Sequence, residues 1–203
     1  MTRFIILFAV VLLTGCSEEK GNTSTDSLIP KPPPALTVDF YKSHNRIEDV
    51  DDGMWEYLLS LIPDDKRPYS VRTAEMLNSV SPELRRYFLT RGFDWQRGGE
   101  GLEGCFMVDD LNDNEYFPED SAKAFESLGA VKQAAIIREL IPKARLRDQQ
   151  VKDAEAKGKK FNFDDGFWNP YEKRWDDACR EFDFYDVIWK DIQAHPERYT
   201  HKK

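Results

Sequence analysis

Helix start and stop signals recur between residues 52 and 195, and they constrain the fold more than any other feature of the sequence. In residues 52–62, Met54, Tyr57, Leu58 and Leu61 recur at the three- and four-residue spacing of one buried helix face, and Pro63 ends the run. Strands would instead alternate apolar and polar residues with a period of two. The pattern therefore predicts an amphipathic helix here.

Capping residues mark where further helices begin. A polar residue or a start-compatible proline precedes an apolar helical pattern at Ser81-Pro82, at Pro118-Glu119 and at Asn169-Pro170. The expected helix ends are Gly92, Gly129, Pro142, Gly158 and the residue before His195. Only Cys105–Val108 has the apolar run of a strand, and no strand–helix–strand alternation or repeat period is present. The predicted fold class is all-α, a mainly helical bundle with at most one short strand or hairpin.

The N-terminus has the pattern of a bacterial lipoprotein signal. Phe4–Leu13 is an unbroken apolar run of ten residues, the length of a signal-peptide core and about half of a membrane span. Leu13-Thr14-Gly15-Cys16 follows and resembles a lipobox. We expect residues 1–15 to be a signal peptide and Cys16 to carry the acyl chains, palmitate among them. The alternatives are an ordinary secretory signal or a buried apolar strand.

Residues 16–38 follow as an expected tether, because they are rich in Ser, Thr, Gly and Pro and poor in bulky apolar residues. The folded domain is expected over residues 39–203. Ser17 stands where an aspartate would resemble an inner-membrane retention signal. The expected location is therefore the cell envelope, with a lipid anchor in the outer membrane and the domain in the periplasm.

The charge balance argues against binding to nucleic acid. The chain has 37 acidic and 29 basic residues, a formal net charge of −8, whereas nucleic-acid binding needs a positive face. Three histidines without metal-ligand spacing, and the lack of a nucleophile or phosphate-loop motif, argue against catalysis. We expect no enzyme activity, no cofactor and no metal site.

The densest acidic segment is the candidate interaction surface. Its carboxylates are Asp109, Asp110, Asp113, Glu115, Glu119 and Asp120, without a base among them. An EF-hand is excluded, because Glu115 and Ser121 stand where the loop needs glycine and a bidentate glutamate. A surface for a basic partner, a looser calcium site and a solvated loop remain as alternatives.

Two cysteines remain if Cys16 is lipidated. Cys105 and Cys179 would form a disulfide in the oxidising envelope if their Cα atoms lie within about 7 Å. The alternative is two separately buried thiols, since both residues have apolar neighbours.

Four segments, in this order, make the chain resemble the DNA-mimic protein family over roughly residues 78–200. They are Gly101–Phe106, Ala124–Ala130 with the alanine-rich helix that follows, the acidic aromatic segment Glu181–Tyr185, and His195–Tyr199. The resemblance implies an all-helical, acidic, non-enzymatic domain whose carboxylates stand in for DNA phosphates. The Asn-Gly-Gly-Phe part of the family core is replaced around Arg97–Leu102.

The expected function is a non-catalytic protein-interaction module on an envelope lipoprotein. The expected contacts are the membrane, through the lipid anchor, and a protein partner that is basic. One alternative is an immunity or inhibitor lipoprotein against a basic toxin or hydrolase. Another is an envelope carbohydrate-active enzyme that uses paired carboxylates.

Overall fold

The structure, a computed structural model, describes residues 33–62, 71–106, 116–161 and 166–200. Within these ranges every regular element is a helix and there is no strand. The all-α prediction is therefore confirmed. The short strand expected at Cys105–Val108 is not found at its first two residues, because Cys105 and Phe106 end a helix. Its other two residues, Met107 and Val108, lie outside the described residues.

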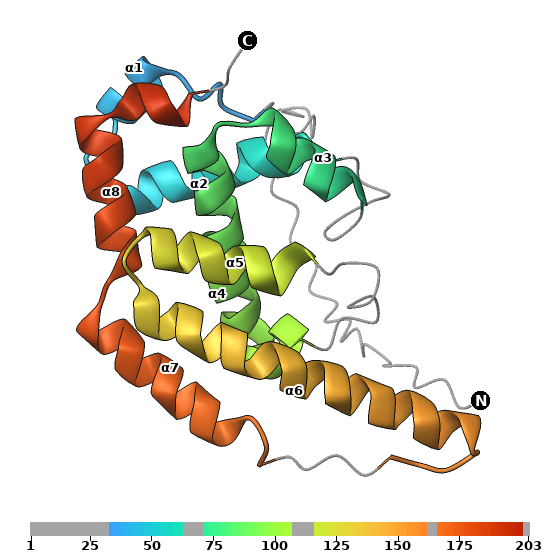
Figure 1. Cartoon of the computed structure of the whole chain (residues 1–203). Coiled ribbons are helices and arrows are strands. Elements are labelled where there is room, and N and C mark those ends of the chain that lie inside the picture. Colours follow the sequence, from blue (N-terminus) through green and yellow to red (C-terminus); the bar gives the residue numbers. More distant parts are fainter. Residues whose placement is uncertain (1–32, 63–70, 107–115, 162–165, 201–203) are drawn as a thin grey trace, which may run out of the picture. The chain divides into compact units, whose positions relative to one another are not determined.

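The helices follow one another along the described parts of the chain (Figure 1). Their bounds are α1 Val38–Lys42, α2 Ile47–Ser60, α3 Val71–Ser79, α4 Pro82–Phe106, α5 Tyr116–Ser127, α6 Val131–Ala156, α7 Asn169–Glu181, α8 Phe184–Ala194 and the 3-10 helix η2 Pro196–Tyr199. The α5–α6 pair has the most extensive contacts, α4 packs across α5, and α7 runs along α6 (Figure 1).

Helix α4 begins as predicted but is longer than expected. The Ser81 hydroxyl accepts a hydrogen bond from the Leu84 amide at 3.2 Å, which caps the first turn. Gly92 does not end the helix; it is buried within it. The helical path is interrupted instead at Gly101, where φ is 70° and ψ is −176°, and it resumes to Phe106. Gly92 is a buried residue without a positive φ, whereas Gly101 has the positive φ that interrupts the helix.

Two further predicted helix ends need correction. Gly129 ends α5 with a φ of 90°, as expected, but Pro142 lies inside α6 and does not stop it. The buried faces on both sides of Pro142, with Ile137 and Ile141 before it and Ala144 after it, keep the helix continuous. The long helical stretch predicted from Asn169 is two helices, since Asp183 caps α8 by accepting from the Asp186 amide at 3.1 Å.

An aromatic cluster joins four helices at the centre of the domain. Phe93 of α4 contacts Phe125 of α5 and Trp175 of α7 at ring-centroid distances of 5.9 Å and 5.3 Å. Phe125 in turn meets Phe184 of α8 at 5.0 Å. Edge-on and tilted contacts of this kind add to the stabilisation from buried area. They fix α8 against α4, which matters for the site described below.

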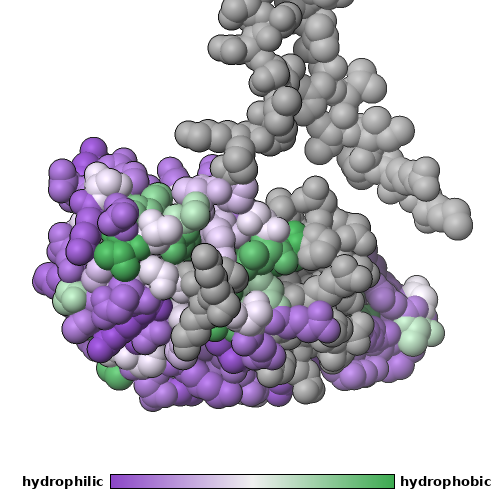
Figure 2. Space-filling view, turned by 90° about the horizontal axis from the view of Figure 1, so that it is seen from above, coloured by the Kyte–Doolittle hydropathy of each residue, from purple (hydrophilic) through white to green (hydrophobic). Residues whose placement is uncertain are grey.

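The N-terminal boundary of the folded unit lies at Pro33, a few residues before the predicted one. Leu36 is buried and the Thr37 hydroxyl caps α1 by accepting from the Phe40 amide at 3.1 Å. The last residues assigned to the tether therefore belong to the domain. Seen from above Figure 1, the described surface is mostly hydrophilic, with small separate apolar patches (Figure 2).

Candidate functional site

Two adjoining grooves lie where α2, α4 and α8 meet. The larger, of about 850 Å³, is bounded by Asp51 of α2, by Tyr185 of α8 and by seven residues of α4: Arg91, Asp94, Trp95, Gln96, Gly98, Gly99 and Glu100. The smaller, of about 450 Å³, shares Asp51 and Tyr185 with it. We call the carboxylates that line both grooves the acidic face; its members are Glu48, Asp51, Asp52, Asp94, Glu100 and Asp183.

The acidic face is strongly unbalanced in charge. Among the described residues that line the two grooves, six carry carboxylates and Arg91 alone carries a positive charge, which gives a formal charge of −5. Outside the lining, Arg46 pairs with Glu48 at 3.3 Å, but both side chains are more than 60% exposed, so the pair is weak. The grooves therefore offer a strongly negative concave surface to a partner.

Asp51 is held in place by two donors from α4. The Tyr87 hydroxyl donates to Asp51 Oδ1 at 2.7 Å and the Arg91 Nε donates to Oδ2 at 2.9 Å. Burial, followed by the charge of Asp51, raises the pKa of Tyr87 well above its usual value, so the phenol remains a donor. These bonds fix the side of α2 that lines both grooves.

Asp94 is a partly desolvated carboxylate of the larger groove. Burial raises its pKa above the usual aspartate value, while Arg97 and a hydrogen bond from Tyr185 at 3.4 Å act in the opposite direction. A carboxylate whose charged form is disfavoured gains most when a cation arrives beside it. Asp94 is therefore a place where a positively charged ligand would bind favourably.

The face of α4 that lines the larger groove also carries an exposed indole. Arg91, Asp94, Trp95 and Gly98 are spaced at i, i+3, i+4 and i+7, so they share one side of the helix. Trp95 is 58% exposed, unusual for a large aromatic residue in a folded domain. Exposed tryptophans are common at the centres of binding surfaces.

The predicted interaction segment is only partly described. Asp109, Asp110, Asp113 and Glu115 lie outside the described residues. Asp120 is paired with Arg85 of α4 at 2.8 Å and with Lys123 at 3.0 Å. Glu119 is paired with Arg145 of α6 at 3.4 Å. The two described members thus connect helices of the domain, and the segment as an interaction surface stays a prediction.

Cys105 and Cys179, the two cysteines in the described part of the chain, do not form a disulfide. Cys105 is a buried free thiol that contacts the Phe93 carbonyl at 3.4 Å, and Cys179 is a half-buried free thiol. Burial raises the pKa of both thiols. This arrangement corresponds to the alternative of two separate thiols. Cys16 lies outside the described residues, so its lipidation stays a prediction.

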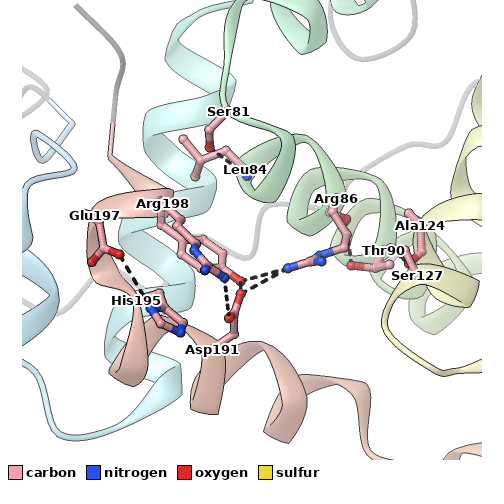
Figure 3. Close-up of polar contacts among 11 residues, drawn as sticks. Ser81, Leu84, Arg86, Thr90, Ala124, Ser127, Asp191, His195, Glu197 and Arg198 are labelled. Carbon is pink, nitrogen blue, oxygen red and sulfur yellow. Dashed lines mark hydrogen bonds and ion pairs between the residues drawn. The ribbon is translucent and has the colours of Figure 1, made fainter.

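The C-terminal segment of the family resemblance holds α8 and η2 against α4 (Figure 3). Asp191 accepts from the Tyr199 hydroxyl at 2.7 Å and from Arg86 at 3.2 Å, and Arg198 approaches it at 3.5 Å. Tyr199 is fully buried, and its carbonyl accepts from the Tyr41 hydroxyl of α1 at 2.7 Å. This segment therefore orients α8, and with it Tyr185 at the groove.

Sequence reasoning missed the acidic face because its members come from three distant segments. The i, i+3, i+4, i+7 set on α4 was the one available signal, since it places an arginine, an aspartate and a tryptophan on a helix side without an apolar stripe. The predicted helix end at Gly92 left Asp94, Trp95 and Gly98 outside the helix, so their common helix side was not recognised.

The described residues contain neither a metal-binding cluster nor a helix able to span a membrane. In that part of the chain, no group of three or more His, Cys, Asp or Glu side chains is arranged to hold a metal ion. None of the helices found there combines the length and apolar character that crossing a bilayer requires.

The fold and the charged grooves define an acidic, all-α domain. Residues 78–199, more than half of the chain, match the family described as DMP19-like protein. The chain therefore belongs to the DMP19-like family, in agreement with the resemblance to DNA-mimic proteins. The match covers the parts of the grooves that α4 and α8 contribute, whereas α2 precedes it. No curated protein and no solved structure gives a significant match.

Proposed function

We propose that this chain is an envelope-anchored lipoprotein whose acidic domain binds a positively charged protein and catalyses no reaction. The observation that carries the proposal is the acidic face, with six carboxylates against one guanidinium in the described lining of two grooves. Membership of a DNA-mimic-like family supports it, because carboxylates in a DNA mimic take the place of phosphates.

Physical chemistry supports a protein partner with lysine or arginine at its contact surface. Carboxylates on rigid helices attract such side chains over a Debye length and make charge-assisted hydrogen bonds on contact. Asp51 and Asp183 are both fixed by hydrogen bonds within the domain, so little ordering is needed when a partner binds. An immunity or inhibitor role would use the same surface, with a toxin or hydrolase as the partner.

A capture experiment from envelope extract tests the binding function. The bait is the full chain with a C-terminal tag, compared with a variant carrying Glu48→Gln, Asp52→Asn, Glu100→Gln and Asp183→Asn. Asparagine keeps the cap of α8 at position 183, and Asp51 stays intact because it pairs with Arg91. We expect the wild type to retain a basic protein that the variant loses.

A control variant separates the groove from charge in general. Glu75, Glu83, Asp153 and Glu155 are carboxylates that line neither groove; Glu83 is half-buried and the other three are exposed. Neutralising these four changes the net charge by the same amount and should leave capture intact. Loss of the partner in both variants, or in neither, would contradict binding at the acidic face.

Membrane anchoring has its own test, which does not depend on the partner. The Cys16→Ala substitution removes the only thiol next to the expected cleavage site, so a clickable palmitate analogue should label the wild type and not the variant. Fractionation should then find the variant outside the membrane pellet. Equal labelling of the two proteins would show that Cys16 is not the anchor.

A further inference from the structure

We propose that the larger groove binds an arginine side chain of the partner, with its guanidinium stacked on Trp95, paired with Asp94 and lying above Gly98 and Gly99. This inference rests on the proposed function, because it assumes a positively charged protein partner. It adds the residue type that enters the groove and the place where it binds.

Trp95 offers an exposed aromatic surface in the larger groove. Its indole is 58% exposed and lines the groove beside Asp94, one residue earlier on the same helix side. An indole is also the aromatic ring that attracts cations most strongly. Its neighbours in the groove include the carboxylates of Asp94 and Glu100, and the one guanidinium in the described lining, that of Arg91, is already paired with Asp51. A cationic group therefore complements the indole better than an apolar one.

The Asp94 carboxylate offers the guanidinium a negatively charged partner. Asp94 is partly desolvated and accepts one long hydrogen bond, 3.4 Å from the Tyr185 hydroxyl. Its remaining acceptor sites are open to a donor in the groove. A guanidinium is planar and carries its donors in a fork, so it pairs with a carboxylate while its face lies on an indole. An ammonium has neither property, and this favours arginine over lysine.

The backbone of α4 also favours a long side chain in the groove, for a reason that does not depend on charge. Gly98 and Gly99 both line the groove within α4 and neither has a positive φ. A Cβ placed at either residue would meet no atom within 4 Å. The fold therefore does not need glycine there, although glycine destabilises a helix relative to alanine. Because the two glycines have no side chains, a long side chain of the partner can lie directly on the helix backbone and reach Asp94.

Short basic peptides test the inference without knowledge of the partner. The full chain in a non-ionic detergent is titrated with tetra-arginine and with tetra-lysine, and binding is followed by the indole N–H resonances and by calorimetry. Both peptides carry the same charge, so the comparison isolates the guanidinium. We expect tetra-arginine to bind at least about five-fold more tightly, and the Trp95 indole signal to move.

Two variants locate the preference. Trp95→Ala removes the indole ring, and Gly98→Leu places a side chain on the open backbone surface. Alanine and leucine are both good helix formers, so neither substitution should unfold α4. Both should reduce the arginine preference to about equal binding while the lysine peptide still binds. Gln193→Leu, at an exposed position of α8 that lines neither groove, is the matched control and should keep the preference.

The outcomes separate this inference from the proposed function. Equal affinity of the wild type for the two peptides, or a preference that survives both Trp95→Ala and Gly98→Leu, would overturn the arginine pocket. In that case partner capture that depends on the acidic face would still support the proposed function. Failure of the wild type to bind either peptide would overturn the pocket and count against the charge-based function as well.

Discussion

At the scale of one residue, the ionised carboxylate of Asp94 in the larger groove lowers the free energy of unfolding of the domain. Burial raises its pKa, although Arg97 and Tyr185 lie near enough to oppose the shift. An acid whose pKa is higher in the folded than in the unfolded state binds its proton more tightly when folded. Its contribution to stability is therefore greatest below the unfolded pKa and declines as the pH rises through the folded pKa. At neutral pH the ionised carboxylate disfavours folding.

The Asp94→Asn substitution should therefore stabilise the domain at pH 7. Asparagine has nearly the same shape, and its amide oxygen can still accept from the Tyr185 hydroxyl, so the packing is retained. Urea unfolding at several pH values between 3 and 8 checks this. The gain should be largest at neutral pH and vanish in acid, where the wild-type carboxyl is protonated.

Asp186 provides the comparison for Asp94. It is an exposed aspartate of α8 that is paired with Lys190 at 2.6 Å. Asp186→Asn should leave the free energy of unfolding within about 0.5 kcal/mol, because exposed pairs contribute little. If Asp94→Asn lowered stability at pH 7, Asp94 would be a structural ion-pair residue and not a desolvated one.

At the scale of helices, Gly101 is the joint between the two parts of α4. Its φ of 70° and ψ of −176° belong to a region that side chains rarely adopt. A Cβ there would also come within 2.8 Å of Glu172 Oε1. Glu172 of α7 accepts from the Leu102 amide and from Arg97 Nε, so it caps the second part of α4.

We predict that Gly101→Ala destabilises the domain by about 1–3 kcal/mol, since the backbone strain and the displaced Glu172 add together. Thermal and urea unfolding measure the loss. Gly98→Ala is the matched control three residues earlier, where the backbone is helical and the space is open. It should stabilise by about 0.5–1 kcal/mol. Equal effects of the two substitutions would contradict the joint.

Pro142 is the second irregularity in a helix. It lies inside α6, where proline removes a backbone hydrogen bond and crowds the preceding turn, and its side chain is exposed. Pro142→Ala should therefore stabilise the protein by about 1–2 kcal/mol, less than the full proline cost because the unfolded chain also gains freedom. Urea unfolding with Lys152→Ala as an exposed control on the same helix checks it.

These elements also show what the sequence predicts and where it fails. Local chemistry located the helix starts at Ser81 and Asn169 and the end at Gly129, because a serine cap, a proline in the first helical turn and a positive φ each depend on neighbouring residues. It failed at Pro142, where buried residues on both sides hold the helix together. The same limit applies to the site: Asp51, Asp94 and Tyr185 meet only through tertiary packing of three helices.

At the scale of the whole molecule, the N-terminal segment and the acidic face lie on different sides of α2. A Cβ on Gly53 would collide with the Phe40 ring at 2.6 Å and approach Pro34 at 3.2 Å, so the segment before α2 packs at this point. With 3.6 residues per turn, Gly53 points roughly opposite to Glu48 and Asp51 and about 100° away from Asp52, and these three carboxylates line the grooves. The described N-terminal segment therefore leaves the acidic face uncovered.

A face with a formal charge of −5 in its described lining should attract its partner before contact, and this predicts a strong salt dependence of association. Between 0.05 and 0.5 M salt, we expect the association rate of the captured partner to fall about ten-fold, while the dissociation rate changes much less. The variant with Glu48→Gln, Asp52→Asn, Glu100→Gln and Asp183→Asn should associate more slowly at low salt and respond only weakly to added salt. The variant neutralised at Glu75, Glu83, Asp153 and Glu155 should keep most of the wild-type response, since its charges lie outside the grooves. Stopped-flow or surface-based kinetics give both rates, and a salt response shared equally by the two variants would assign the attraction to net charge and not to the acidic face.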